Sequence, residues 1–174
     1  MRIVFAFSLI LILTASRLWA GTVEDGIKAY DNKDYKQAMS LLSPLADQGN
    51  TEALSTVGLM YYYGHGVQED NLTAFKFFKQ AADKGYADAQ FLLGNMYMYH
   101  YGDPQADTDS DREAVRWYVE AATQGHAEAQ YTLGLLLLAG SIVAQDTNEA
   151  MVWIKRAADQ GHKEAKQFLG EYSE

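Results

Sequence analysis

Apolar residues recur in four segments of the chain with the spacing of one face of an α-helix. Each segment places Ala or larger apolar residues at positions i, i+3, i+4, i+7 and i+8, which predicts an amphipathic helix. A glycine three residues beyond each set predicts the helix end, because glycine readily takes the left-handed conformation found there. The sets are Ala38, Leu41, Leu42, Leu45 and Ala46; Ala74, Phe77, Phe78, Ala81 and Ala82; Ala114, Trp117, Tyr118, Ala121 and Ala122; and Ala150, Trp153, Ile154, Ala157 and Ala158, followed by Gly49, Gly85, Gly125 and Gly161.

These segments belong to an internal repeat. The sequence Ala-Asp-Gln-Gly at 46–49 recurs in related form at 82–85, 122–125 and 158–161, at successive offsets of 36, 40 and 36 residues. A glycine inside a helix costs about 1 kcal/mol relative to alanine, so a repeated one predicts helix contacts too close for a Cβ atom. Two further columns keep the same offsets: Ala53, Ala89, Ala129 and Ala165, and Gly58, Gly94, Gly134 and Gly170.

Stacked helix pairs are the architecture that this repeat predicts. One helix pair cannot bury both of its faces, so neighbouring pairs must pack together. The chain also contains only two prolines, which favours helices throughout. We therefore expect an all-α solenoid of antiparallel helix pairs that forms one domain over 21–174. Its expected units are a first pair at 24–50, repeats at 51–86, 87–126 and 127–162, and a closing helix at 163–174.

Helix starts are marked by capping residues. Ser110 with Glu113, and Asp146 with Glu149, have the spacing of a capping box, in which each side chain accepts a hydrogen bond from a free backbone N–H. Asp70 occupies the same position as Asp146 in its own repeat and is expected to cap a helix as well.

The second repeat unit carries a pattern that resembles the Sel-one-like repeat family, a relative of the tetratricopeptide repeats. The resemblance covers 51–86, 87–126 and 127–162 and the start of a fourth repeat. Two segments depart from it: 24–50 is closer to a tetratricopeptide unit, and the 87–126 repeat lacks the Gly-x-Gly-Val loop and is four residues longer. The pattern is made of Ala53, Leu59, Met60, Tyr61, Tyr63, Gly64, His65, Gly66, Val67, Asp70, Ala74, Phe77, Ala81 and Ala82.

The resemblance implies a right-handed superhelix whose concave side is lined by the first helix of each pair. It also implies an adaptor that brings proteins together, often in bacterial envelopes or secretory compartments. A cysteine-rich branch of the family is connected with β-lactam binding and hydrolysis, but this chain has no cysteine, so we do not expect that activity. An enzyme of that kind and a cell-wall-binding accessory protein are the alternative functions.

The first twenty residues differ from the rest of the chain. Arg2 precedes a short apolar stretch, and the segment ends at Ala20 before polar residues begin. These are the parts of a secretory signal peptide. The apolar stretch, Ile3 to Leu13, is shorter than the about 20 residues that a membrane-spanning helix needs. We expect cleavage after Ala20 and a periplasmic or secreted protein without stable membrane insertion, with cleavage after Ser16 or an uncleaved anchor as alternatives.

Charge and cysteine content exclude several function classes. The formal charge is −9, and residues 21–174 alone hold 12 basic and 23 acidic residues. Binding to nucleic acid requires a basic surface that replaces the counterions of the phosphates, so a nucleic-acid partner is not expected. The absence of cysteine excludes disulfides, thiolate metal sites and cysteine nucleophiles.

Candidate chemistry is sparse, and we predict no catalytic residue, no metal and no cofactor. His126 and His162 occupy equivalent positions in two repeats, so we interpret them as turn residues, and no pair of histidines has the spacing of a zinc site. The acidic stretch from Asp103 to Asp111 has the alternating carboxylates of half a calcium loop, but Arg112 and Tyr118 stand where an EF-hand needs Gly and Glu. A solvated loop is the interpretation we favour there.

Tyrosine is the remaining feature, with twelve copies. Because the first helices should line the concave side, their large side chains are expected to face a partner protein or peptide. Tyrosine suits recognition, since it combines a large ring with one hydroxyl and few rotatable bonds. Acidic residues near the start of these helices would favour basic segments in the partner. The predicted groove residues are Tyr62, Tyr63, Phe91, Met98, Tyr99, Tyr131, Glu52, Asp88 and Glu128.

Overall fold

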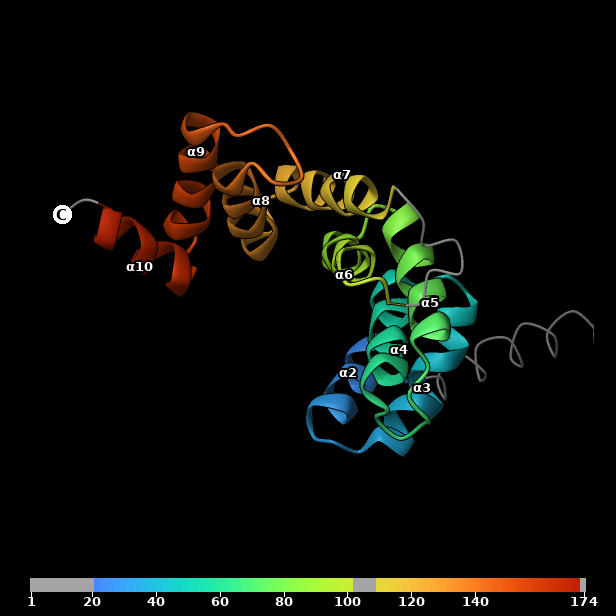
Figure 1. Cartoon of the computed structure of the whole chain (residues 1–174). Coiled ribbons are helices and arrows are strands. Elements are labelled where there is room, and N and C mark those ends of the chain that lie inside the picture. The colour runs from blue at the N-terminus through green and yellow to red at the C-terminus, as the bar shows by residue number, and fades with distance from the viewer. Residues whose placement is uncertain (1–20, 102–108, 173–174) are drawn as a thin grey trace, which may run out of the picture.

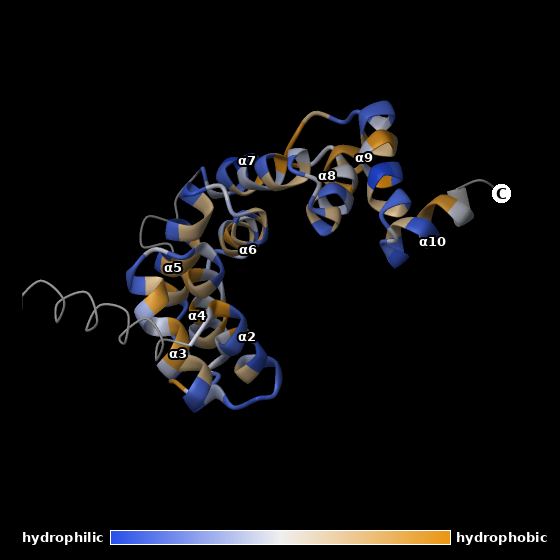
Figure 2. Cartoon of the chain, turned by 180° about the vertical axis from the view of Figure 1, so that it is seen from behind, coloured by the Kyte–Doolittle hydropathy of each residue, from blue (hydrophilic) through white to orange (hydrophobic). Residues whose placement is uncertain are grey.

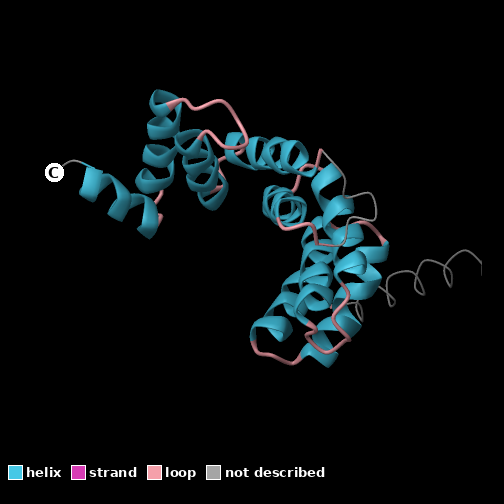
Figure 3. Ribbon diagram, viewed as in Figure 1, coloured by secondary structure: helices cyan, strands magenta, loops and turns pink. Residues whose placement is uncertain are grey.

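The computed structural model describes residues 21–101 and 109–172. Within these residues the chain forms nine helices and no strand, joined by short loops (Figure 3). We number the helices from α2, as in Figure 1. They are α2 (Val23–Asp31), α3 (Tyr35–Asp47), α4 (Thr51–Tyr63), α5 (Asn71–Asp83), α6 (Ala87–Met98), α7 (Ser110–Thr123), α8 (Ala127–Ala139), α9 (Thr147–Asp159) and α10 (Lys163–Tyr172).

The helices stack in chain order into a curved array (Figure 1). Each odd-numbered helix from α3 to α9 packs antiparallel against the even-numbered helix before it. Helices α2, α4, α6, α8 and α10 lie on the inner side of the curve, whereas α3, α5, α7 and α9 lie on the outer side. The all-α solenoid of antiparallel helix pairs is therefore confirmed.

The core follows the apolar face predicted for the outer helices. In α9 all five predicted positions, from Ala150 to Ala158, are buried, and the same holds for α7 between Ala114 and Ala122. Figure 2 shows that the helices carry hydrophobic and hydrophilic residues side by side along their length. The buried residues form one large cluster from α2 to α7 and two smaller ones from the end of α7 to α10.

The glycine column inside the inner helices marks close helix contacts, as predicted. A Cβ atom built on Gly58 would lie 2.7 Å from Phe78 Cε1, and one on Gly94 would lie 2.7 Å from Tyr118 Cε1. At Gly134 the corresponding atom is Ile154 Cγ1 at 2.5 Å. The repeated glycine thus lets a large side chain of the outer helix reach the backbone of the inner one. The glycines that end the outer helices also take the expected positive φ angles, from 81° at Gly49 to 99° at Gly161.

Two of the three predicted caps hold. Asp70 and Asp146 accept hydrogen bonds from the backbone N–H groups of Thr73 and Glu149 at 3.0 and 2.9 Å. The predicted box at Ser110 is wrong, because α7 is preceded by Asp109 and Ser110 is its first, buried residue.

The partner side chain in each predicted box is engaged elsewhere. The carboxylate of Glu113 binds Arg116 at 2.7 Å instead of turning back to the helix start. In α9 the side chain of Glu149 accepts a hydrogen bond from Trp153 Nε1 at 3.2 Å. Salt-bridge and tryptophan partners one turn further along the helix therefore compete with the capping position for the same carboxylate.

Several predictions concern residues outside the described ranges. The signal peptide at 1–20 and most of the acidic stretch from Asp103 to Asp111 belong to them. Among the described helices, none combines the length and apolar character that crossing a bilayer requires.

Candidate partner-binding groove

A groove of about 600 Å³ lies on the inner side of the array, across α2, α4 and α6 and the start of α8. Most of its lining side chains are apolar or aromatic. The lining residues are Ile27, Tyr30, Asp31, Ser55, Thr56, Leu59, Tyr86, Asp88, Phe91, Leu92, His126 and Glu128. We call this surface the inner groove.

The residues that precede α6 and α8, Tyr86 and His126, line the inner groove. His126 precedes α8 and caps it, because its Nδ1 accepts a hydrogen bond from the Ala129 N–H at 3.1 Å. The same ring stacks on Phe91 with 4.9 Å between the centroids, and its Nε2 lies 3.5 Å from Asp88 Oδ1. Tyr86 precedes α6, and its hydroxyl donates to Asp88 Oδ2 at 3.1 Å. Asp88 is thus held between the starts of two successive repeats.

The inner groove is negatively charged. Asp31, Asp88 and Glu128 line it, and none of the described residues that line it is Lys or Arg. Burial lowers the pKa of His126, an effect opposed by the charges of Asp88 and Glu128, so the imidazole is neutral around neutral pH. Cationic groups of a ligand would therefore be attracted to this groove.

Burial and the neighbouring carboxylates both affect Tyr86. Its pKa is raised to about 12, first by burial and then by the charge of Asp88, its hydrogen bond to Asp88 and the charge of Glu52. The phenol therefore stays protonated over the physiological range and remains a hydrogen-bond donor.

The same arrangement recurs one repeat further along. His162 caps α10 through its Nδ1, which accepts from the Ala165 N–H at 3.2 Å, and its Nε2 lies 2.9 Å from Glu128 Oε2. Its ring packs on Tyr131 with 4.8 Å between centroids. The repeat therefore places an acid, an aromatic ring and a histidine cap together at each of the last two junctions.

The structure brings together part of the predicted groove set. Phe91, Asp88 and Glu128 line the inner groove, and Glu52 lies close enough to affect Tyr86. Tyr131 lies on α8, in the next junction along the array. The role of these residues in binding stays a prediction.

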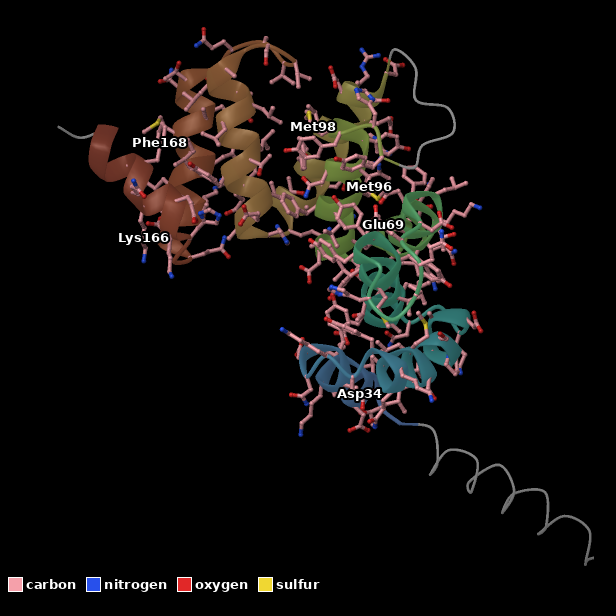
Figure 4. The ribbon with its side chains drawn as sticks, turned by 60° about the horizontal axis from the view of Figure 1, so that its bottom comes forward. Asp34, Glu69, Met96, Met98, Lys166 and Phe168 are labelled. Atoms are coloured by element: carbon pink, nitrogen blue, oxygen red, sulfur yellow. The ribbon has the colours of Figure 1, made fainter. Side chains whose placement is uncertain are left out.

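The other predicted residues lie elsewhere. Tyr62, Tyr63 and Tyr99 lie at the carboxyl ends of α4 and α6. This end is about 16 Å from the start of the helix, because eleven residues of helix separate the two. Met98 is half-buried and leaves α6 in a different direction from the buried Met96 (Figure 4). The predicted set of aromatic residues on the inner helices is thus divided between two surfaces.

Sequence reasoning missed several lining residues. Tyr30, Leu59 and Leu92 lie on inner helices but were not distinguished from packing residues; Tyr86 was not singled out, and His126 was interpreted as a turn residue. Tyr86 and His126 could have been found from the repeat, because both occupy the same position in their repeats, directly before an inner helix. Each inner helix from α4 onward is preceded by a residue at this position. That position holds Asn50, Tyr86, His126 and His162.

No group of three or more His, Asp or Glu side chains among the described residues is placed to hold a metal ion. His65 lies in the loop after α4, where its Nδ1 is 3.1 Å from the hydroxyl of Tyr30. His126 and His162 act as helix caps, so the three histidines have structural partners of their own.

The sequence model of the Sel1 repeat matches four segments, 20–50, 51–86, 87–126 and 127–162. The match thus includes the first segment, which we expected to be closer to a tetratricopeptide unit. A search of curated proteins gave no match.

Solved structures give the same fold. A Sel1 repeat protein from Oxalobacter formigenes is 36% identical, with a TM-score of 0.75 over 82% of this chain and 55% of that one. A protective antigen present in uropathogenic Escherichia coli strains, which displays an SLR fold, is 31% identical, with a TM-score of 0.77 over 92% of this chain. The present chain spans only 35% of that antigen. The cysteine-rich protein B of Helicobacter pylori shares the fold, with a TM-score of 0.59 at 16% identity over 78% of this chain and 94% of that one.

Proposed function

The chain belongs to the Sel1 repeat family, and on this premise we propose that it is a scaffold that holds a basic segment of a partner protein in the inner groove. Proteins of this family are generally non-enzymatic scaffolds for protein–protein interaction. The proposal adds the surface that is used and the chemistry of the segment that it holds.

The charge of the inner groove carries the proposal. Three carboxylates line a largely apolar and aromatic surface, without a lining Lys or Arg among the described residues to neutralise them. An arginine or lysine side chain can lay its methylene groups against Leu59, Phe91 and Leu92 while its charged end meets Asp88. Arginine also stacks well on aromatic rings such as Phe91. The groove is therefore complementary to a segment that alternates basic and apolar side chains.

Site-specific photocrosslinking in the native host tests this proposal. A photoreactive phenylalanine analogue placed at Leu59 should crosslink to a partner, because this side chain lines the inner groove. The matched control carries the same analogue at Val152, a side chain of the outer helix α9 that is 49% exposed. The double variant Asp88→Asn and Glu128→Gln should lower the crosslink yield at Leu59, and raising the salt concentration should lower it further.

Three results would contradict the proposal. Equal crosslinking from Leu59 and Val152 would show that the inner groove is not a preferred surface. No effect of the double charge variant would show that the carboxylates do not recognise the partner. A crosslinked partner segment without basic residues would contradict the stated chemistry.

We also propose that the chain is exported with removal of residues 1–20. The position of the first described helix supports this, since α2 begins at Val23 and its cap, Thr22, makes a capping box with Asp25. Cleavage after Ala20 would leave this cap intact. N-terminal sequencing of the protein from the periplasm or medium should give Gly21 first, whereas a start at Met1 in that fraction would contradict the cleavage.

A further inference from the structure

Six rings form a continuous row at the ends of the helices, away from the carboxylates of the inner groove. The row joins the start of α3, the end of α4 with its following loop, and the end of α6 with its following loop. Neighbouring ring centroids are 4.5 Å (Tyr35 and His65), 5.4 Å (His65 and Tyr63), 4.8 Å (Tyr63 and Tyr62), 6.2 Å (Tyr62 and Tyr101) and 6.1 Å (Tyr101 and Tyr99) apart. We call these six residues the tyrosine row.

Three members of the tyrosine row are strongly exposed to solvent. Tyr99 is 63% exposed, Tyr63 is 56% exposed and Tyr101 is 43% exposed. Tyr99 and Tyr63 are the two most exposed large hydrophobic side chains in the described part of the chain. Single exposed apolar residues are ordinary, but a contiguous group of them indicates an interaction surface. The row is therefore a candidate docking site.

The angles between neighbouring ring planes indicate which kind of partner fits the tyrosine row. Tyr62 meets Tyr63 at 81° and Tyr101 at 61°, so the middle of the row forms angular notches around Tyr62 rather than a flat platform. The only nearly parallel neighbours in the row, Tyr35 and His65, lie 11° apart and cover each other's faces. A sugar ring needs a free, flat aromatic face. A proline ring instead fits between tilted aromatic rings, as in the known aromatic grooves for proline-rich segments.

A small cavity deepens one notch. It has a volume of about 60 Å³ and lies beneath Tyr62 and Tyr63, where Phe78, Leu92, Asn95 and Met96 complete its wall. This volume is about that of two water molecules, so it can receive part of a compact side chain.

The hydroxyls of the row suit an extended backbone. The pKa of Tyr62 is raised, first by burial and then by the neighbouring Tyr63 and Tyr101, so its hydroxyl stays protonated and can donate. A polyproline helix makes no internal hydrogen bonds and leaves its carbonyls free to accept them. Such a segment is already extended before it binds, so docking on an open surface costs little conformational entropy.

One residue connects the tyrosine row to the inner groove. The hydroxyl of Tyr30 lies 3.1 Å from Nδ1 of His65 in the row, and Tyr30 also lines the inner groove beside Asp31. A segment that follows the row can therefore continue into a region of carboxylates. Charge complementarity then favours a basic residue next to the prolines.

From these contacts we propose that the tyrosine row binds an extended, proline-containing segment of a partner protein, with an adjacent basic residue reaching the inner groove. Only the basic residue rests on the function proposed above. Recognition of proline by the row is independent of it.

Three labelled peptides of about ten residues test the two parts separately. The first consists of Pro-Pro-Ala units flanked by arginines, the second replaces the arginines by glutamine, and the third keeps the arginines but replaces every proline by serine. Fluorescence anisotropy with the mature chain should rank the first above the second and the second above the third. The double variant Tyr63→Ala and Tyr99→Ala should weaken binding of the first two peptides by at least about tenfold.

Two further variants separate the surfaces. Asp31→Asn with Asp88→Asn should weaken only the first peptide, to the level of the second. Val119→Ala with Val152→Ala removes exposed apolar groups from the outer helices and should change nothing. If the groove variant has no effect while the row variant does, the basic-segment proposal fails and the proline proposal stands. Circular dichroism should show equal helix content in all variants.

The proposal is overturned if the serine peptide binds as tightly as the first, or if the row variant binds all peptides unchanged. It is also overturned if no peptide binds at about 1 mM, or if a soluble cell-wall oligosaccharide binds and requires Tyr63 and Tyr99, which would identify a glycan surface. Amide shifts of Tyr63 and Tyr99 in a spectrum of the unmodified chain, titrated with the second peptide, provide a readout that needs no substitution.

Discussion

Four glycines occupy the same position in successive inner helices, but the surroundings of the last one differ. Cβ atoms on Gly58, Gly94 and Gly134 would all lie under 3.0 Å from a large side chain of the outer helix. A Cβ atom on Gly170 would meet nothing within 4 Å, because no described helix follows α10. The same residue type is therefore required by packing at three positions and not at the fourth.

This difference gives a matched pair of variants. Gly134→Ala places a methyl group 2.5 Å from Ile154 Cγ1 and 3.0 Å from the backbone oxygen of Ala150. Overpacking of this kind typically costs about 1–3 kcal/mol, of which alanine's higher helix propensity returns at most about 1. We expect a lower urea midpoint for Gly134→Ala and an equal or slightly higher one for Gly170→Ala. Equal midpoints for both variants would contradict the packing argument.

His126 gives a prediction for the dependence of stability on pH. Burial lowers its pKa below the value of 6.5 expected in the unfolded chain, so the unfolded state binds more protons between the two values. Stability is therefore full above about pH 6.5 and falls as the pH drops toward the lower, folded value. His126→Asn removes this titration and keeps a capping oxygen, as Asn50 does for α4.

Urea midpoints at several values between pH 7.5 and pH 5 provide the measurement. The slope with pH should be smaller in His126→Asn than in the parent chain, even if the loss of stacking on Phe91 lowers all midpoints. His100→Asn is the control, because His100 is exposed and has a positive φ of 56° that asparagine tolerates. A parental slope in His126→Asn would show that another group is responsible.

At the scale of elements, buried glutamines join successive repeats. Gln130 on α8 is 4% exposed; its Nε2 donates to the Ala122 carbonyl at the end of α7 at 3.0 Å. Its Oε1 accepts from Gln160 at the end of α9 at 2.7 Å. Gln90 on α6 makes the equivalent bonds to Ala82 and Gln124 at 3.3 and 2.6 Å. One side chain thus fixes three helices relative to one another.

Removing this link should destabilise the array. Gln130→Ala loses both hydrogen bonds and leaves a cavity, for an expected cost of about 1–3 kcal/mol. Gln130→Leu should cost less, because Leu54 occupies the equivalent position in α4 and is fully buried there. Thermal unfolding followed by circular dichroism measures both, with the exposed Gln37→Ala as control. A smaller loss for the alanine variant than for the leucine variant would contradict this account.

The helices were predictable from sequence because the residues that determine each helix are close together in the chain. The i, i+3, i+4 spacing, the closing glycines and the glycine column depend on residues within one repeat, and the structure reproduces all three. The failed cap at Ser110 has a different cause. The Glu113 carboxylate could bind either the backbone N–H at the helix start or Arg116, and it forms the salt bridge with Arg116. The periodicity of apolar residues does not predict which of these partners the carboxylate binds.

The surfaces were less predictable, because they form between repeats. Phe91 on His126 and Tyr62 beside Tyr101 are contacts across 35 and 39 residues of sequence, set by how successive pairs stack. Sequence alone placed the tyrosines on the inner helices but could not tell which end of a helix adjoins which loop. For this reason one predicted groove became the inner groove and the tyrosine row.

At the scale of the whole molecule, stability is distributed unevenly along the array. One buried cluster extends from Ala29 to Trp117 and unites the first three helix pairs. The clusters of α8 to α10 are smaller and are formed by fewer helices. In a solenoid each unit is stabilised mainly by its neighbours, so the end with the smaller core should open first. Both proposed binding surfaces lie mainly on the more strongly packed part.

Deletion of residues 163–174 tests this uneven distribution. Helix α10 buries Ala165 and covers Ile154, Ala157 and Ala158 with Phe168 and Leu169, so its loss exposes an apolar surface on α9. Using the usual free energies of side-chain burial, we expect a loss of about 2–4 kcal/mol, confined to α8 and α9. Limited trypsin digestion, read by mass spectrometry, should then cut first after the exposed residues Lys155 and Arg156 of α9. Sites in α5, such as Lys76, should stay protected as in the full chain; equally fast cleavage there would show that the array unfolds as a single cooperative unit.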